Sequence, residues 1–169
     1  MCLCEYALLP MKVPKIGALL GNSALFSLKI DGVSGLTRVV QFSGHEGLSS
    51  LYEFQIEVAG EEIDLAAMIG KKATLTIDGI DLPRQIHGLL SEVQYSGQSR
   101  RYTLYKLTLV PPLWKLSLRT NSRVFQPGST PEILKKVFAD AGLDPNDLRF
   151  ALSAAYGERN YCVQYRESD

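Results

Sequence analysis

Apolar and polar residues alternate along much of the chain between Leu25 and Val110. The clearest case is residues 51–58, where four apolar residues alternate with three polar ones: Tyr52, Phe54, Ile56 and Val58 against Glu53, Gln55 and Glu57. A period of two is typical of a strand with one face on a core and one face in water. We therefore predict a strand here, with Phe54 and Ile56 buried.

Five further segments are predicted as strands: 25–30, 36–42, 73–77, 84–95 and 101–110. Turn sequences such as Asp31-Gly32 and Asp78-Gly79 separate some of them. Within 84–95 the apolar phase slips near Gly88, which predicts a β-bulge there. Six short antiparallel strands suggest a small barrel or a sandwich. Residues 101–110 are apolar on both faces and so need cover on both sides, which favours a closed or nearly closed barrel over residues 24–111.

After Pro111-Pro112 the pattern changes from strand to helix. Four apolar residues follow within six positions: Leu113, Trp114, Leu116 and Leu118. Because they leave no polar side to expose, we predict a short helical turn with Trp114 buried next to the barrel. Replacing a buried tryptophan by alanine costs about 3–5 kcal/mol.

A second helix is marked by its ends. Ser129 or Thr130 caps its start, Ser129 and Glu132 have the spacing of a capping box, and Gly142 follows its last turn. Its apolar residues fall on one stripe: Ile133, Leu134, Val137, Phe138 and Ala141. A strand is predicted at 161–165. The chain is thus mainly β with some α, a small antiparallel β-barrel followed by an α/β layer.

Charge and cysteine content restrict the function. The 169 residues carry 18 basic and 18 acidic side chains, whereas a protein that grips phosphate backbones usually has a basic surplus. Nucleic acid is therefore not expected as a partner. Residues 1–23 form an extension without a regular period, lack the form of a signal peptide, and contain no apolar run of about 20 residues. An odd count of three cysteines favours a reducing compartment, so we expect a cytoplasmic protein without stable membrane insertion.

No catalytic or metal-binding constellation stands out. A Cys-His pair would need Cys162 with His45 or His87, but Cys162 lies in an alternating segment where a buried, inert thiol is usual. His45 is expected in a solvated loop and His87 in the core or sheet. Cys2 and Cys4 form a single CxC, a poor match to zinc-site spacing. We predict no enzyme activity, no cofactor and no metal.

Five stretches, in order and in register, resemble one family. They are 46–54 (EGLSSLYEF), 112–116 (PLWKL), 121–126 (NSRVFQ), 131–134 (PEIL) and 161–169 (YCVQYRESD). The family is that of the valine–glycine repeat protein G (VgrG) spikes of type VI secretion systems, with their phage tail-hub relatives. The resemblance runs from about residue 25 to residue 169, and residues 1–23 have no counterpart in it.

The resemblance implies a structural role and an organisation. Residues 24–111 correspond to the first hub barrel and 112–169 to the start of an α/β layer that is incomplete at its C-terminus, so a truncated hub is expected. In the family, three protomers present six similar barrels that dock a hexameric (Hcp-like) tube ring and support effector delivery. The spike assembles in the bacterial cytoplasm and is exported without a cleavable signal peptide. Alone, this chain is expected to be monomeric or to associate non-natively.

The candidate interface is the polar face of residues 51–58, formed by Glu53, Gln55 and Glu57. Plain solvation is the alternative for each of these side chains taken singly. Two other classes of function remain open at this point. A small β-barrel binding module would need a basic or aromatic groove, and a Cys-His hydrolase would need a reactive Cys162 beside His87.

Overall fold

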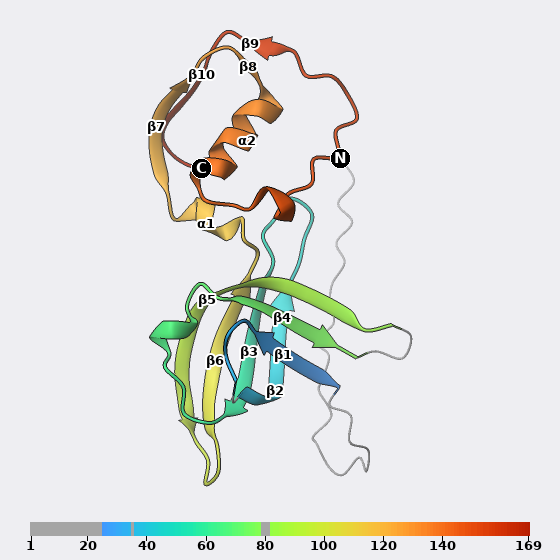
Figure 1. Ribbon diagram of the computed structural model, residues 1–169, viewed down its shortest axis with the longest axis vertical. Coiled ribbons are helices and arrows are strands. Elements are labelled where there is room, and N and C mark those ends of the chain that lie inside the picture. Colours follow the sequence, from blue (N-terminus) through green and yellow to red (C-terminus); the bar gives the residue numbers. More distant parts are fainter. Residues whose placement is uncertain (1–24, 35, 79–81) are drawn as a thin grey trace.

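A computed structural model describes residues 25–34, 36–78 and 82–169, which form a curled sheet and a smaller unit of helices and short strands (Figure 1). The six strands of the sheet lie in the antiparallel order β1-β4-β5-β6-β3-β2. They are β1 (Phe26–Ile30), β2 (Leu36–His45), β3 (Glu53–Gly60), β4 (Lys72–Ile77), β5 (Arg84–Gln98) and β6 (Thr103–Val110). A 3-10 turn, η1 (Ala66–Met68), joins β3 to β4. All six predicted strands are confirmed.

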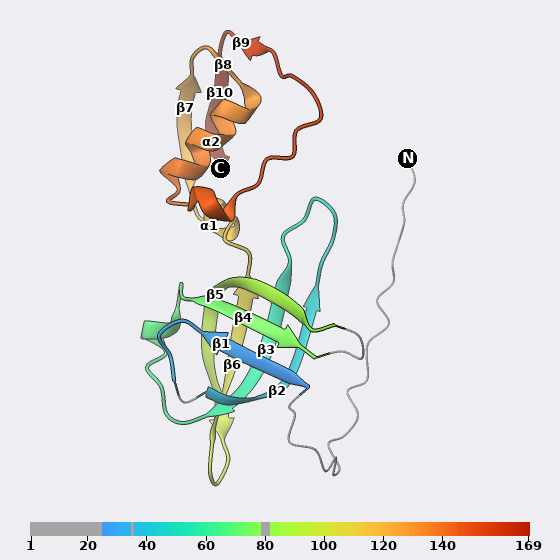
Figure 2. The same ribbon diagram turned by 45° about the vertical axis from the view of Figure 1, so that its right-hand side comes forward.

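The sheet curls until its two edges approach each other (Figure 2). Phe26 of β1 and Phe42 of β2 meet edge to face with ring centroids 5.1 Å apart. The edges are thus joined by side chains, and in the described part of the chain no backbone ladder links β1 to β2. The result is a half-barrel, which confirms the predicted mainly β, antiparallel class.

The bulge predicted near Gly88 is present in β5, a few residues further along the strand. Gly88 pairs regularly with Ala73 of β4, and the β5–β6 register shifts between Leu90 and Glu92 instead. The lack of a side chain at Gly88 allows β5 and β6 to lie close together here, because a Cβ at this position would lie 2.4 Å from the carbonyl oxygen of Val110. The phase slip in the sequence therefore came from the bulge after Leu90.

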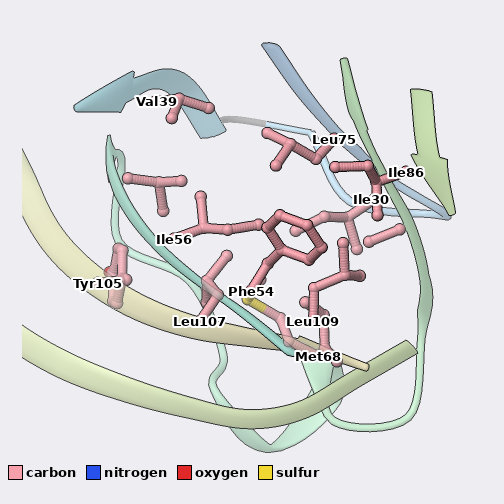
Figure 3. Close-up of a cluster of buried hydrophobic side chains, with 13 residues drawn as sticks. Ile30, Val39, Phe54, Ile56, Met68, Leu75, Ile86, Tyr105, Leu107 and Leu109 are labelled. Carbon is pink, nitrogen blue, oxygen red and sulfur yellow. The ribbon is translucent and has the colours of Figure 1, made fainter. Parts of the chain in front are cut away.

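Thirteen buried residues fill the concave side of the sheet, among them Phe54 and Ile56, which are 5% and 1% exposed (Figure 3). Their predicted burial is confirmed. The expectation that β6 is covered on both faces holds only at the end of the strand. Tyr105, Leu107 and Leu109 point inward, while on the outer face Lys106 is exposed and Val110 is 2% exposed.

The smaller unit contains two helices and two strand pairs. They are α1 (Trp114–Ser117), β7 (Thr120–Phe125), β8 (Gly128–Ser129), α2 (Thr130–Asp140), a 3-10 turn η2 (Pro145–Asp147), β9 (Glu158–Arg159) and β10 (Cys162–Ser168). β10 pairs antiparallel with β7, and β8 with β9. Both predicted helices and the strand near 161–165 are confirmed, whereas β7, β8 and β9 were not predicted. Within the described residues, no helix has the length and apolar character needed to cross a bilayer.

Helix α2 begins with the predicted capping box. The Glu132 carboxylate accepts hydrogen bonds from the Ser129 backbone N–H at 2.7 Å and from the Ser129 hydroxyl at 2.8 Å. These bonds lower the pKa of the Glu132 carboxyl. The inner face of α2 packs into a small core of four buried residues: Leu116, Phe125, Val137 and Leu143.

Trp114 is half-buried, so its predicted full burial is wrong. Helix α1 is a single turn and can turn only one side inward, and Leu116 occupies that side. Leu113 and Leu118 remain exposed. The Trp114→Ala substitution is therefore expected to cost less than the loss of a fully buried tryptophan.

Candidate protein interface

The convex face of the half-barrel carries polar side chains in rows across neighbouring strands. Side chains alternate along a strand, so residues paired in register share a face. One row runs Gln41, Glu57, Lys106 and Gln94 across β2, β3, β6 and β5. The next row runs Ser43, Gln55, Thr108 and Glu92. A third pairs His45 with Glu53. We call these rows the polar face.

Neutral donors orient two carboxylates of the polar face. Glu57 accepts hydrogen bonds from Gln41 Nε2 at 2.6 Å and from Ser96 Oγ at 3.4 Å. Glu92 accepts from Gln94 Nε2 at 2.5 Å and from Thr108 Oγ1 at 3.5 Å. Both carboxylates are therefore held in place by neutral partners. Such an arrangement suits recognition of another protein surface.

The structure brings the three residues of the candidate interface together on this face. Gln55 is exposed, and Glu53 and Glu57 are half-buried between their neighbours. A shallow hollow of about 230 Å³ lies around Gln55 and Glu57. Sequence reasoning missed the other residues that line it: Gln41, Phe42, Ser43, Ile56 and Lys106. The alternation of Lys106 with Tyr105 and Leu107 was the available signal, but the register between strands is not visible in the sequence.

The residues considered for catalysis are not assembled. Cys162 is half-buried against the small core of the C-terminal unit, whereas His45 and His87 lie on the sheet. His45 is an exposed residue at the end of β2, not in a loop. His87 is exposed on β5 and its Nδ1 hydrogen-bonds Thr74 Oγ1 at 3.0 Å, so it is a sheet histidine. Among the described residues, no group of three or more His, Cys, Asp or Glu side chains could hold a metal ion. Cys2 and Cys4 lie outside the described residues.

A mostly apolar cleft of about 380 Å³ separates the sheet from the C-terminal unit. Its walls include Tyr52 and Pro111 on one side and Phe138, Leu148 and Phe150 on the other. Burial, with a smaller effect of the Glu46 charge, raises the pKa of the Tyr52 hydroxyl, which donates to the His87 carbonyl. Lys72 and Asp147 form an exposed ion pair at 3.1 Å between the two units. The cleft holds no paired acid and base.

Comparison with known proteins settles the family. The model of the phage tail baseplate hub (GPD) family matches residues 45–169. The chain belongs to this family. The match includes most of the half-barrel and all of the C-terminal unit.

Curated relatives carry the name of type VI secretion spikes, as the sequence resemblance suggested. The spike protein VgrG4b of Pseudomonas aeruginosa is 39% identical over 150 residues, covering 88% of this chain and 18% of its own length. VgrG3 of Vibrio cholerae is 38% identical over 158 residues, covering 85% of this chain and 15% of its own. The chain thus spans less than a fifth of the length of these relatives.

A solved structure shows the same fold. It is that of the E. coli c3393 protein, described as a component of the type VI secretion system with structural similarity to the T4 bacteriophage tail proteins gp27 and gp5. The TM-score is 0.71 at 22% sequence identity, over 85% of this chain and 40% of that one. The tail-hub-like class of the fold is therefore established.

Proposed function

We propose that the chain is a structural hub part of a type VI secretion spike. Residues 24–111 form its first hub barrel and residues 112–169 begin the α/β layer. As part of a full-length spike, this region belongs to a homotrimer that assembles in the bacterial cytoplasm, docks a hexameric Hcp-like tube ring and supports effector delivery during export. The family match and the spike relatives support the proposal.

The polar face is the structural feature that supports the proposed docking of the tube ring. It is broad and built on a sheet, and its carboxylates are held by neutral hydrogen-bond donors. Preorganised polar groups lose little entropy on binding and give specificity to a contact between two proteins. We propose that Glu53, Gln55 and Glu57 are contact residues for the tube ring.

The proposed role requires no catalysis. One relative, 36% identical over 157 residues, is named as an actin cross-linking toxin of Vibrio cholerae, but this chain covers only 14% of it. Because so little of the toxin is matched, its activity is not assigned to this chain. The described residues offer no assembled Cys-His pair, and we propose a non-enzymatic protein.

Binding to an Hcp-like hexamer tests the proposal. The chain is immobilised at high density, so that weak sites act together, and the hexamer is passed over it. We expect saturable binding that weakens at least about tenfold in a Glu53→Ala, Gln55→Ala, Glu57→Ala variant, because central contacts dominate interface energy. Glu62→Ala, an exposed loop carboxylate away from the polar face, is the matched control.

Two results would overturn the proposal. One is the absence of binding by the folded chain at any hexamer concentration that the surface can sample. The other is equal binding by the triple variant and the Glu62→Ala control, which would remove the polar face from the contact.

A further inference from the structure

The side chain of Asp169 is completely shielded from solvent. Its Oδ1 and Oδ2 accept from Asn121 Nδ2 at 2.9 and 3.0 Å, and Oδ1 also accepts from Gln164 Nε2 at 3.0 Å. Arg123 Nη2 donates to Oδ1, and Arg119 Nε lies 3.4 Å from Oδ2. Four side chains from β7, from β10 and from the residue before β7 therefore surround one carboxylate. We call Arg119, Asn121, Arg123 and Gln164 the cradle.

The chain departs from a regular strand to deliver this carboxylate. Arg166 has a left-handed backbone with φ of 50°, and the β7–β10 register shifts between Tyr165 and Glu167. The Gln164 amide donates to the carbonyl oxygens of Glu167 at 3.1 Å and Ser168 at 3.2 Å. A non-glycine residue in this conformation is sparsely populated and persists where its surroundings over-determine it. The bulge turns the Asp169 side chain inward.

The cradle is also tied to the rest of the C-terminal unit. Arg123 contacts Asp140 of α2 at 3.1 Å, and its guanidinium lies over the Phe125 ring with 5.2 Å to the ring centroid. Arg119 Nη1 is buried without a hydrogen-bond partner among the described residues. Two guanidinium groups thus face inward with one carboxylate between them, so removing that carboxylate takes away the ion pair of Arg119 and leaves Arg123 paired with Asp140 alone among the described residues.

We propose that Arg119, Asn121, Arg123 and Gln164 form a carboxylate-binding site whose ligand is the chain's own Asp169, and that its occupation latches β10 onto β7. The hydrophobic core of this unit contains only four buried residues. A two-stranded ribbon with so little apolar cover is marginal by itself. The cradle supplies the contact that holds the ribbon against α2.

The test is hydrogen exchange on the whole chain carrying a Gly-Ser extension, so that no free α-carboxylate lies at residue 169. The extended chain is the reference for the same chain with Asp169→Ala. We expect amides of β7 and β10 to exchange at least about tenfold faster in the variant, because local opening sets their rate. Amides of β3 and β6 should be unchanged. Glu167→Ala, an exposed carboxylate two residues away, is the matched control and should exchange like the reference.

Chemical rescue distinguishes a ligand site from general loss of packing. Added formate should slow exchange of β7 and β10 in Asp169→Ala back toward the reference, whereas chloride at equal ionic strength should not. Formate should have no effect when Arg123→Gln is combined with Asp169→Ala. If the single variant is too unstable for native exchange, the same comparison is made on its urea midpoint, which formate should raise and chloride should not.

Three outcomes would overturn the proposal. They are unchanged exchange in Asp169→Ala, equal rescue by formate and chloride, and rescue that survives the loss of Arg123. Because the measurement involves no tube ring, its failure leaves the proposed docking function untouched.

Discussion

At the scale of single residues, Asp169 shows how a buried charge is kept ionised. Burial alone would raise the pKa of its carboxyl. Hydrogen bonds from Asn121 and Gln164 and the charges of Arg123 and Arg119 outweigh burial and hold the pKa below its ordinary value of 3.8. The folded state therefore binds a proton at Asp169 less readily than the unfolded state does.

This difference predicts acid sensitivity of the C-terminal unit. For a carboxyl whose pKa is depressed by folding, the stabilisation is fully present above the unfolded pKa and is lost as pH falls through the folded one. Exchange of β7 and β10 amides, corrected for intrinsic rates, should accelerate relative to β3 and β6 as pH drops below about 4. Asp169→Asn should remove this component of the pH dependence. A variant with the same acid profile as the parent chain would show that Asp169 is not the source of the acid sensitivity.

A second prediction at this scale concerns Gly88. A Cβ at this position would stand 2.4 Å from the Val110 carbonyl oxygen, a backbone atom that cannot move without shifting β6. Gly88→Ala should destabilise the sheet by about 1–3 kcal/mol, the usual range for overpacking. The control is Gly157→Ala, where a Cβ would meet nothing within 4 Å, and its change should stay within about 0.5 kcal/mol. Urea denaturation of both variants measures the difference, and equal midpoints would contradict the close approach.

Single residues also show where sequence reasoning stops. Alternation placed Phe54 and Ile56 correctly because a strand has only two faces. Trp114 was placed too deep, because an apolar cluster does not reveal which side of a single helical turn faces the core. Asp169 and Arg123 both lie in the stretches that carry the family resemblance, but their ion pair joins positions far apart in the sequence. Only the β7–β10 register brings them together.

At the scale of elements, the sequence predicted those helices and strands whose signals lie within a single segment. The capping box and apolar stripe of α2 lie within one segment, and so does the period of β3. Strand β7, with the sequence TNSRVF, was missed because four of its six residues are polar and its partner follows almost forty residues later. The β5 bulge could be placed only to within a few residues for a related reason, since register is fixed by the facing strand β6 and not by β5 alone.

The cap of α2 is directly testable. Ser129→Ala removes the hydroxyl from the capping box and should destabilise the C-terminal unit by about 0.5–2 kcal/mol, the measured range for such caps. The exposed Ser153, in the loop between η2 and β9, is the control, and Ser153→Ala should be near neutral. Exchange of α2 amides under native conditions provides the measurement. Equal protection of α2 in the two variants would show that the Ser129 hydroxyl does not stabilise the start of the helix.

At the scale of the whole molecule, the described residues form two cores of unequal size. One cluster has thirteen buried residues inside the half-barrel, and the other has four in the C-terminal unit. The link between the two units includes Pro111-Pro112 and the exposed Lys72–Asp147 ion pair, and exposed pairs add little stability. Neither core depends on the other for its buried contacts.

We therefore predict that the chain unfolds in two steps. The C-terminal unit should open first with rising denaturant, while β3 and β6 keep their protection, because the smaller core offers less burial to offset chain entropy. Phe125→Ala should shift only the first step and Leu107→Ala only the second. A single transition that both substitutions shift equally would show that the cleft and the ion pair couple the two units.

The final prediction follows from the outer face of the β7–β10 ribbon. Val124, Val163 and Tyr165 are each more than half exposed there, and Val163 is paired directly with Val124. Contiguous exposed apolar surface promotes association, so sedimentation velocity should show a mass that rises with protein concentration. Val163→Lys should suppress this rise, because it places a charge at the centre of the face without touching the core on the other side of the ribbon.

Leu48→Lys is the control, since Leu48 is fully exposed in the β2–β3 loop, away from the ribbon. A concentration-independent monomer, or equal suppression by both substitutions, would show that the ribbon face does not drive association. A concentration-independent trimer of the parent chain that Val163→Lys leaves intact would place the threefold contact on another surface.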